Sequence, residues 1–144
     1  MDQDETPDTG EDFGYNLPEW DQELRDAIAE HADRHIGGEP WEIGEIVSDQ
    51  INLRLRIYPP AEDRPYYTIV TSGMSERPMN VPPGMDGFAR AELVLVLPQE
   101  WIVVGRNGSV DDPEAAKPKN YWPIGQLKRI ARLPFDYDTW LAFG

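Results

Sequence analysis

The sequence of 144 residues contains no cysteine and only two histidines. The absence of cysteine excludes disulfides, thiolate metal sites and a cysteine nucleophile. No apolar run approaches the roughly 20 residues that a membrane-spanning helix needs. The N-terminus, Met1 to Glu5, is acidic, whereas a secretory signal is basic and then apolar. We therefore expect a cytoplasmic protein with no membrane partner.

Basic residues are also scarce, since 13 Lys and Arg stand against 27 Asp and Glu and give a formal net charge of −14. DNA and RNA repel such a chain, which argues against a nucleic-acid partner. The charge favours either a basic protein partner or simple solubility. Residues 1–15 carry six acidic residues and no base. We expect a solvated, disordered acidic tail there, with a contact for a basic partner as the alternative.

The remaining residues, 16–144, have the length of one domain with a substantial core. Two segments in it carry the apolar periodicity of amphipathic helices. The first helix is expected to begin at Asn16 as its cap and to end at Gly37, where glycine adopts the left-handed conformation at low cost. The second covers residues 123–133, with a proline in its first turn and Pro134 as its end.

The segments between these helices have the patterns of strands. A short strand is expected at residues 43–47. Residues 51–57 alternate apolar and polar side chains and residues 66–70 return, which predicts an antiparallel hairpin. Residues 88–97 become apolar on both faces, which favours a central strand covered on both sides, and residues 101–104 fit a strand or a helix equally. The predicted fold is α+β, a mostly antiparallel sheet flanked by two main helices.

Few residues offer catalytic or metal chemistry. His31 and His35 are four residues apart on the first predicted helix, a spacing that can bind zinc. The glutamate base of zinc hydrolases is missing between them, and no third histidine exists. Ser72 and Ser75 lack the flanking glycines of a nucleophile elbow. We expect no enzyme, no metal and no cofactor, with a metal-dependent enzyme that uses the two histidines as the alternative.

The most unusual loop runs from Thr71 to Met79 and holds two methionines between the breakers Gly73 and Pro78. Methionines in a loop place their side chains either under the loop or in a partner. Neighbouring glutamate and arginine side chains in this loop are expected to have separate partners, with Glu92 and Arg90 as candidates. Exposed aromatic residues would extend a protein-binding patch, although core packing is the default for them. The candidate protein-binding residues are therefore Met74, Glu76, Arg77, Met79, Trp122 and Tyr137.

Three ordered stretches, residues 71–79, 90–98 and 121–141, resemble the suppressor-of-fused family, and the resemblance covers about residues 35–144. The resemblance implies the same mixed fold and a non-enzymatic, protein-binding role. In animals the family name belongs to a repressor of Hedgehog signalling that sequesters a transcription factor. This small acidic form is similar instead to the bacterial members, which are associated with polymorphic toxin systems as immunity proteins. The resemblance thus implies a basic toxin domain as the partner, occluded by the acidic chain.

Two features depart from the family pattern. Family members usually continue past the position of Gly144 with further strands, so the resemblance implies that the domain is incomplete at its C-terminus and that one sheet edge is open. Residues 101–120 look longer than the corresponding family loop. An accessory domain without a dedicated partner remains a third interpretation, and the sequence leaves the partner's identity and the oligomeric state open.

Overall fold

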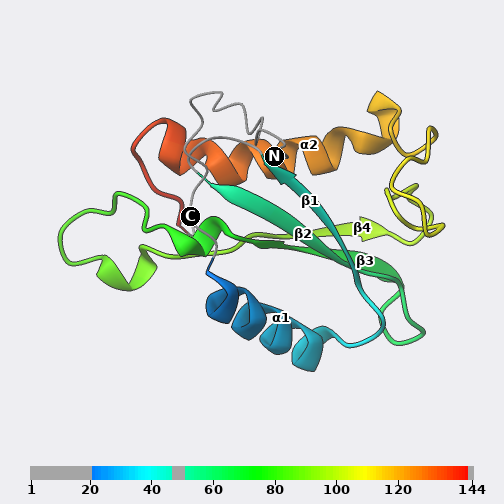
Figure 1. Cartoon of the computed structure of the whole chain (residues 1–144), viewed down its shortest axis with the longest axis horizontal. Helices are drawn as coiled ribbons and strands as arrows, with labels where there is room; N and C mark the ends of the chain where they lie inside the picture. The colour runs from blue at the N-terminus through cyan, green and yellow to red at the C-terminus, as the bar shows by residue number, and fades with distance from the viewer. Residues whose placement is uncertain (1–20, 47–50, 143–144) are drawn as a thin grey trace, which may run out of the picture.

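The computed structural model describes residues 21–46 and 51–142. Its framework is one antiparallel sheet with a helix on each face, which confirms the predicted α+β fold (Figure 1). The strands lie in the order of the chain, and two short 3-10 helices, η1 and η2, follow β3. The elements are α1 (Gln22–Ile36), β1 (Trp41–Ile46), β2 (Asn52–Tyr58), β3 (Tyr66–Ser72), η1 (Met74–Glu76), η2 (Asp86–Phe88), β4 (Val94–Pro98) and α2 (Pro118–Asp136).

Alternation along β2 decides which helix packs on which face of the sheet. Leu53, Leu55 and Ile57 are buried in the larger hydrophobic cluster, which also contains residues of α2. The intervening side chains point to the opposite face, where Tyr58 packs in a second, smaller cluster with Ala32 of α1. Burying one such aliphatic side chain contributes about 1.5–3 kcal/mol, so the larger cluster is the main source of stability.

Helix α1 begins later in the chain than the sequence suggested. Asp21 is its N-cap and accepts a hydrogen bond from the backbone of Leu24 at 3.0 Å. The prediction of a start at Asn16 is wrong, because Asp21 is extended and supplies the cap itself; Asn16 lies outside the described residues. The predicted end is confirmed, since Gly37 has a φ of 79° and its N–H donates to the Asp33 carbonyl.

The hairpin of β2 and β3 is confirmed, but the prediction for the last strand is wrong. Among the described strands, β4 pairs only with β3 and lies at the edge of the sheet. Its alternate residues Val94 and Val96 are 62% and 51% exposed. The apolar run suggested a covered central strand, yet α1 packs on β3, and the two valines of β4 on that face of the sheet stay more than half exposed. Pro98 is consistent with an edge, where a missing N–H costs no ladder hydrogen bond.

Helix α2 is longer than predicted at both ends. It begins at Pro118, where the missing N–H has no helical partner in any case, and it passes through Pro123. Pro134 does not end the helix as expected. It lies in the last turn, which closes when the N–H of Tyr137 donates to the Leu133 carbonyl at 3.1 Å.

The segment between β4 and α2 forms turns and neither a strand nor a helix over residues 101–104. Two tryptophans fix it to the rest of the fold. The Trp41 indole N–H donates to the Val104 carbonyl at 3.0 Å, and that of Trp101 donates to the Asn120 carbonyl at 2.8 Å. Within the part of the chain that the structure describes, no helix has the length and apolar character needed to cross a bilayer.

Candidate protein-binding site

The loop after β3 is held from beneath by the carboxylate of Glu92. One oxygen of Glu92 accepts from the Thr71 hydroxyl at 2.9 Å and from the Met74 N–H at 3.1 Å. The other accepts from the Ser75 N–H at 2.8 Å and from the Ser75 hydroxyl at 2.5 Å. A single side chain thus ties β3 and η1 to the segment that leads into β4.

Burial raises the pKa of Glu92 above its ordinary value, although hydrogen bonds from Ser75, Thr71 and Met74 lower it in part. The same loop receives a second constraint from Arg90, whose guanidinium donates to the Ser75 carbonyl at 2.9 Å. The sequence had pointed to Glu92 and Arg90 as partners of the loop's charged side chains. The structure shows that both instead bind its backbone and hydroxyl groups.

A buried ion pair holds the other side of the loop. Arg25 of α1 donates to Glu76 at 2.6 Å, and the two side chains are 4% and 9% exposed. Arg25 also donates to the Asn52 carbonyl at the start of β2. Gly73 lies against this contact with a φ of 118°, and a Cβ there would collide with the Asn52 carbonyl and approach Arg25 Nη2 to 2.7 Å. Glu76 therefore has a structural role, because its ion pair holds the loop against α1.

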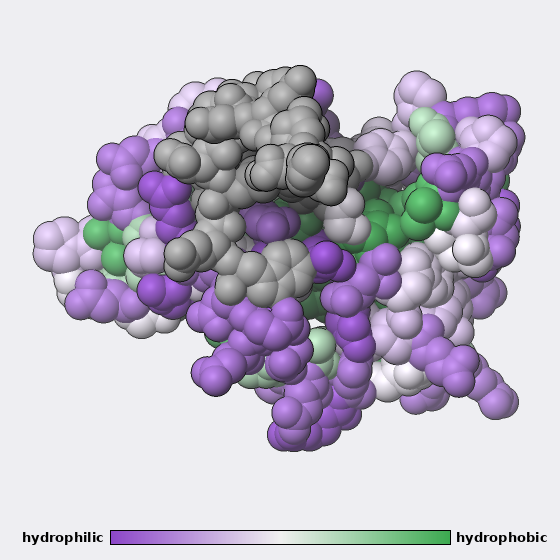
Figure 2. Space-filling view, in the orientation of Figure 1, coloured by the Kyte–Doolittle hydropathy of each residue, from purple (hydrophilic) through white to green (hydrophobic). Residues whose placement is uncertain are grey.

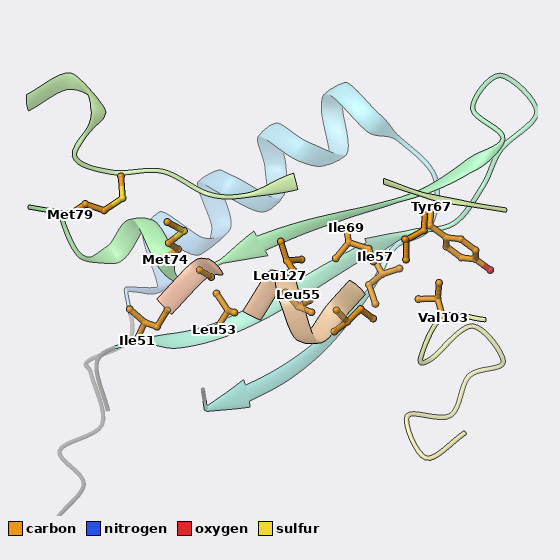
Figure 3. Packing of buried hydrophobic residues seen from close by; sticks show 13 residues of the cluster. Ile51, Leu53, Leu55, Ile57, Tyr67, Ile69, Met74, Met79, Val103 and Leu127 are labelled. Atoms are coloured by element: carbon orange, nitrogen blue, oxygen red, sulfur yellow. The ribbon is translucent and has the colours of Figure 1, made fainter. Parts of the chain in front are cut away.

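The two loop methionines are in the core. Met74 is 1% exposed and Met79 is 4% exposed, and both belong to the larger hydrophobic cluster (Figure 3). The structure thus places both methionine side chains under the loop and not where a partner could reach them. These two residues therefore do not form a binding surface. Arg77 is exposed, and its guanidinium carbon lies 5.7 Å from the centre of the Phe135 ring.

The residues considered for chemistry are not arranged as a catalytic centre. The hydroxyl of Ser75 donates to Glu92, whereas both histidines of the chain are on α1. The rings of His31 and His35 contact each other at a tilt of 38°, with centroids 4.2 Å apart, and both residues are exposed. Among the residues of known position, no three His, Cys, Asp or Glu side chains gather into a group that could hold a metal ion.

The remaining two candidates, Trp122 and Tyr137, are exposed on α2 and just after it, at 57% and 76%. Ile130 and Leu133 are also exposed, at 42% and 36%, and the spacing of the four residues places them on one side of the helix. We call this set of four the α2 surface. The coloured part of the face seen in Figure 2 is mostly hydrophilic. Along α2, by contrast, these four large side chains are exposed together in one stripe.

A groove of about 380 Å³ separates α2 from β4. Its lining is entirely uncharged and consists of Leu93, Val94, Leu95, Val96, Leu97, Trp122, Pro123, Gln126, Leu127 and Ile130. Sequence reasoning missed Val94, Val96 and Ile130 as surface residues, because the apolar run predicted burial of the two valines and helical periodicity placed Ile130 in the buried stripe. The proline at position 98 was the available signal that this strand lies at an edge.

The fold and this surface define an α+β domain with a framework of one antiparallel sheet between two helices. The family model described as Suppressor of fused protein (SUFU) matches residues 49–144. The chain therefore belongs to the suppressor-of-fused family, and the match begins later than the residue 35 suggested by the resemblance. Searches of curated proteins and of solved structures gave no match.

Proposed function

We propose that this chain is a non-enzymatic binding domain, of the bacterial immunity type, that covers a basic toxin domain and blocks its action. The observation that carries the proposal is the α2 surface, where four large apolar side chains are exposed on one helical stripe. Exposed aromatic anchors of this kind contribute most of the binding energy at protein interfaces. The net charge of −14 supports a basic partner, because opposite charge accelerates encounter.

The mechanism is steric occlusion by a surface that is already formed. The base of α2 packs in the main core through Ile124, Leu127 and Ala131, so its outer face is presented on a rigid support. A partner that buries Trp122 and Tyr137 gains apolar contact without paying to order a flexible segment. Covering the substrate-binding face of a nuclease-like toxin would then be sufficient for inhibition.

The test uses the C-terminal domain of a large secreted protein encoded beside this chain. That domain is expressed in a bacterial host with and without the chain, and binding of the purified pair is measured by calorimetry. We expect the wild-type chain to restore growth. The double variant Trp122→Ala/Tyr137→Ala should weaken binding by at least roughly tenfold and lose protection.

The matched control is Phe88→Ala, which removes an aromatic side chain that is 42% exposed and belongs to η2 and not to α2. It should bind and protect like the wild type. A wild-type chain that neither binds the neighbouring domain nor restores growth would refute the immunity role. Equal losses for the control and the double variant would show that the α2 surface is not the binding site.

A further inference from the structure

We propose that strand β4 pairs with β4 of a second copy of this chain, joining the two sheets into one across a twofold axis at Leu95. The proposal goes beyond the function proposed above and needs no toxin partner. It starts from the exposed edge of β4, where Val94 and Val96 are 62% and 51% exposed. Long apolar edges attract other strands, and monomeric proteins usually protect them with charge, proline or a covering element.

Charge selects this edge over the other edge of the sheet. Strand β1, at the opposite edge, carries Glu42, and pairing two copies along β1 would bring these carboxylates toward one another in a chain with a net charge of −14. The stretch from Leu93 to Leu97 contains no charged residue, and neither does the rest of the groove beside it. Two copies can therefore meet along β4 without placing like charges in contact.

The hydrogen-bonding direction of β4 defines which backbone groups face outward. The Thr71 N–H donates to the Leu93 carbonyl at 3.0 Å, so the polar groups of Leu93 point toward β3. Because antiparallel ladders alternate, those of Leu95 also point toward β3. The N–H and C=O groups of Val94 and Val96 therefore point away from the sheet, toward an incoming strand.

These directions favour a register centred on Leu95, in which both outward-facing valines of β4 are paired. With the axis at Leu95, Val94 of each copy lies opposite Val96 of the other, and both pairs exchange N–H and C=O groups to form a complete ladder. Moving the axis to Val96 sets Val94 opposite Pro98, which has no N–H to donate. The Leu95 register also places Glu100 of one copy at the same end of the joined strands as Arg90 of the other.

This arrangement also accounts for the exposed valines. Val94 and Val96 point to the face of the sheet that carries α1. In the dimer, Val94 of each copy would pack against Val96 of the other. A twofold axis perpendicular to the sheet leaves both α2 helices on one face. The two α2 surfaces would then lie on the same side of the assembly, where one partner can reach both.

The test is the mass of the purified full-length chain in solution, measured by sedimentation equilibrium over a range of concentrations. The wild type should show twice the monomer mass. Val94→Lys/Val96→Lys should be monomeric, because it sets lysine opposite lysine in both pairs. Val94→Lys/Val96→Glu should restore the dimer, because this register sets Lys opposite Glu twice. The control Val110→Lys, at a position that is also 62% exposed, should remain dimeric.

Circular dichroism of each variant verifies folding before its mass is interpreted. A wild type that stays monomeric at every concentration overturns the proposal, including the case in which β4 instead receives a strand from another protein. A Lys/Glu variant that stays monomeric beside a dimeric wild type overturns the Leu95 register. Because the measurement uses this chain alone, its failure leaves the proposed toxin-binding role untouched, and failure of that role leaves the dimer untouched.

Discussion

At the scale of single residues, the loop after β3 depends on a glycine that cannot be replaced without moving the backbone of another strand. Gly73 combines a left-handed φ of 118° with direct contact to Asn52 and Arg25. The Arg25 side chain is itself fixed by its ion pair with Glu76. Neither neighbour can withdraw freely, because one is backbone and the other is a buried, paired charge.

Replacing Gly73 with alanine should therefore lower the free energy of unfolding by about 2–4 kcal/mol, measured by denaturant unfolding. The control is Gly84→Ala, since Gly84 also has a positive φ, of 87°, but has open space around its Cβ position. It should cost only the left-handed conformation, about 1 kcal/mol. Equal losses in the two variants would show that the contact with Asn52 and Arg25 has no energetic role.

At the scale of elements, Glu92 connects the end of β3 to the start of β4. A glutamine at position 92 keeps the shape of the side chain but replaces one carboxylate oxygen with an NH₂ group. This NH₂ donor would face the backbone N–H of Met74 or Ser75, which is also a donor. We expect Glu92→Gln to destabilise the fold by about 1–3 kcal/mol, because a buried donor loses its acceptor. Denaturant unfolding at several pH values measures the difference between the variant and the wild type.

That difference should depend on pH with a definite sign. Burial raises the pKa of Glu92 in the folded chain above its ordinary 4.5, so between these two values the folded state holds more protons than the unfolded state. The contribution of Glu92 is therefore fully present below about pH 4.5 and decreases as pH rises through the raised pKa. The stability advantage over the glutamine variant should shrink over this range. An advantage that grows with pH would contradict the direction of the shift.

The elements that sequence predicted well are those whose periodicity has one physical meaning. Alternation along β2 placed Leu55 in the core and Arg56 toward the other face. A shift of the strand by one residue would exchange the two faces and bury the arginine in the core. The β4 prediction was wrong because an apolar run describes both a covered strand and an exposed edge. Only the neighbours in the sheet distinguish the two, and they come from distant parts of the chain.

The candidate site was predicted only in part for a similar reason. Trp122 and Tyr137 are on the surface, as a binding role requires, whereas Met74 and Met79 fill the core. Composition cannot separate a methionine under a loop from one in an interface, since both are apolar and flexible. The partner of Glu76 was also missed, because Arg25 is 51 residues away in sequence.

At the scale of the whole molecule, charge is distributed unevenly. The chain has a net charge of −14, yet α2 carries four basic residues and a single acidic one. Lys128 is buried, Arg132 forms an ion pair with Asp136 at 3.4 Å, and Lys119 lies 4.0 Å from the Glu114 carboxylate, whereas Arg129 is exposed. Under the function proposed above, a basic partner would be attracted by the chain as a whole but would meet positive charge beside the α2 surface.

This unevenness predicts that Arg129→Glu speeds association with a basic toxin domain, measured by stopped-flow mixing at low salt. The control Arg34→Glu changes the net charge by the same amount on α1, on the opposite face of the sheet (Figure 1). It should accelerate association less, because the proposed docking surface is on the other side of the sheet. Both gains should fade in high salt. Slower association for Arg129→Glu would identify the partner as acidic.

The ion pair between Arg25 and Glu76 joins a residue outside the segment matched by the family model to a residue inside it. The match begins at residue 49, after α1 and β1, but Arg25 belongs to α1, and Trp41 of β1 anchors the segment before α2. A piece excised at residue 49 would lose an outer strand and leave a buried glutamate without its cation. The segment that the family model matches is therefore shorter than the fragment needed for a stable fold. A fragment fused into another protein must begin ahead of Asp21.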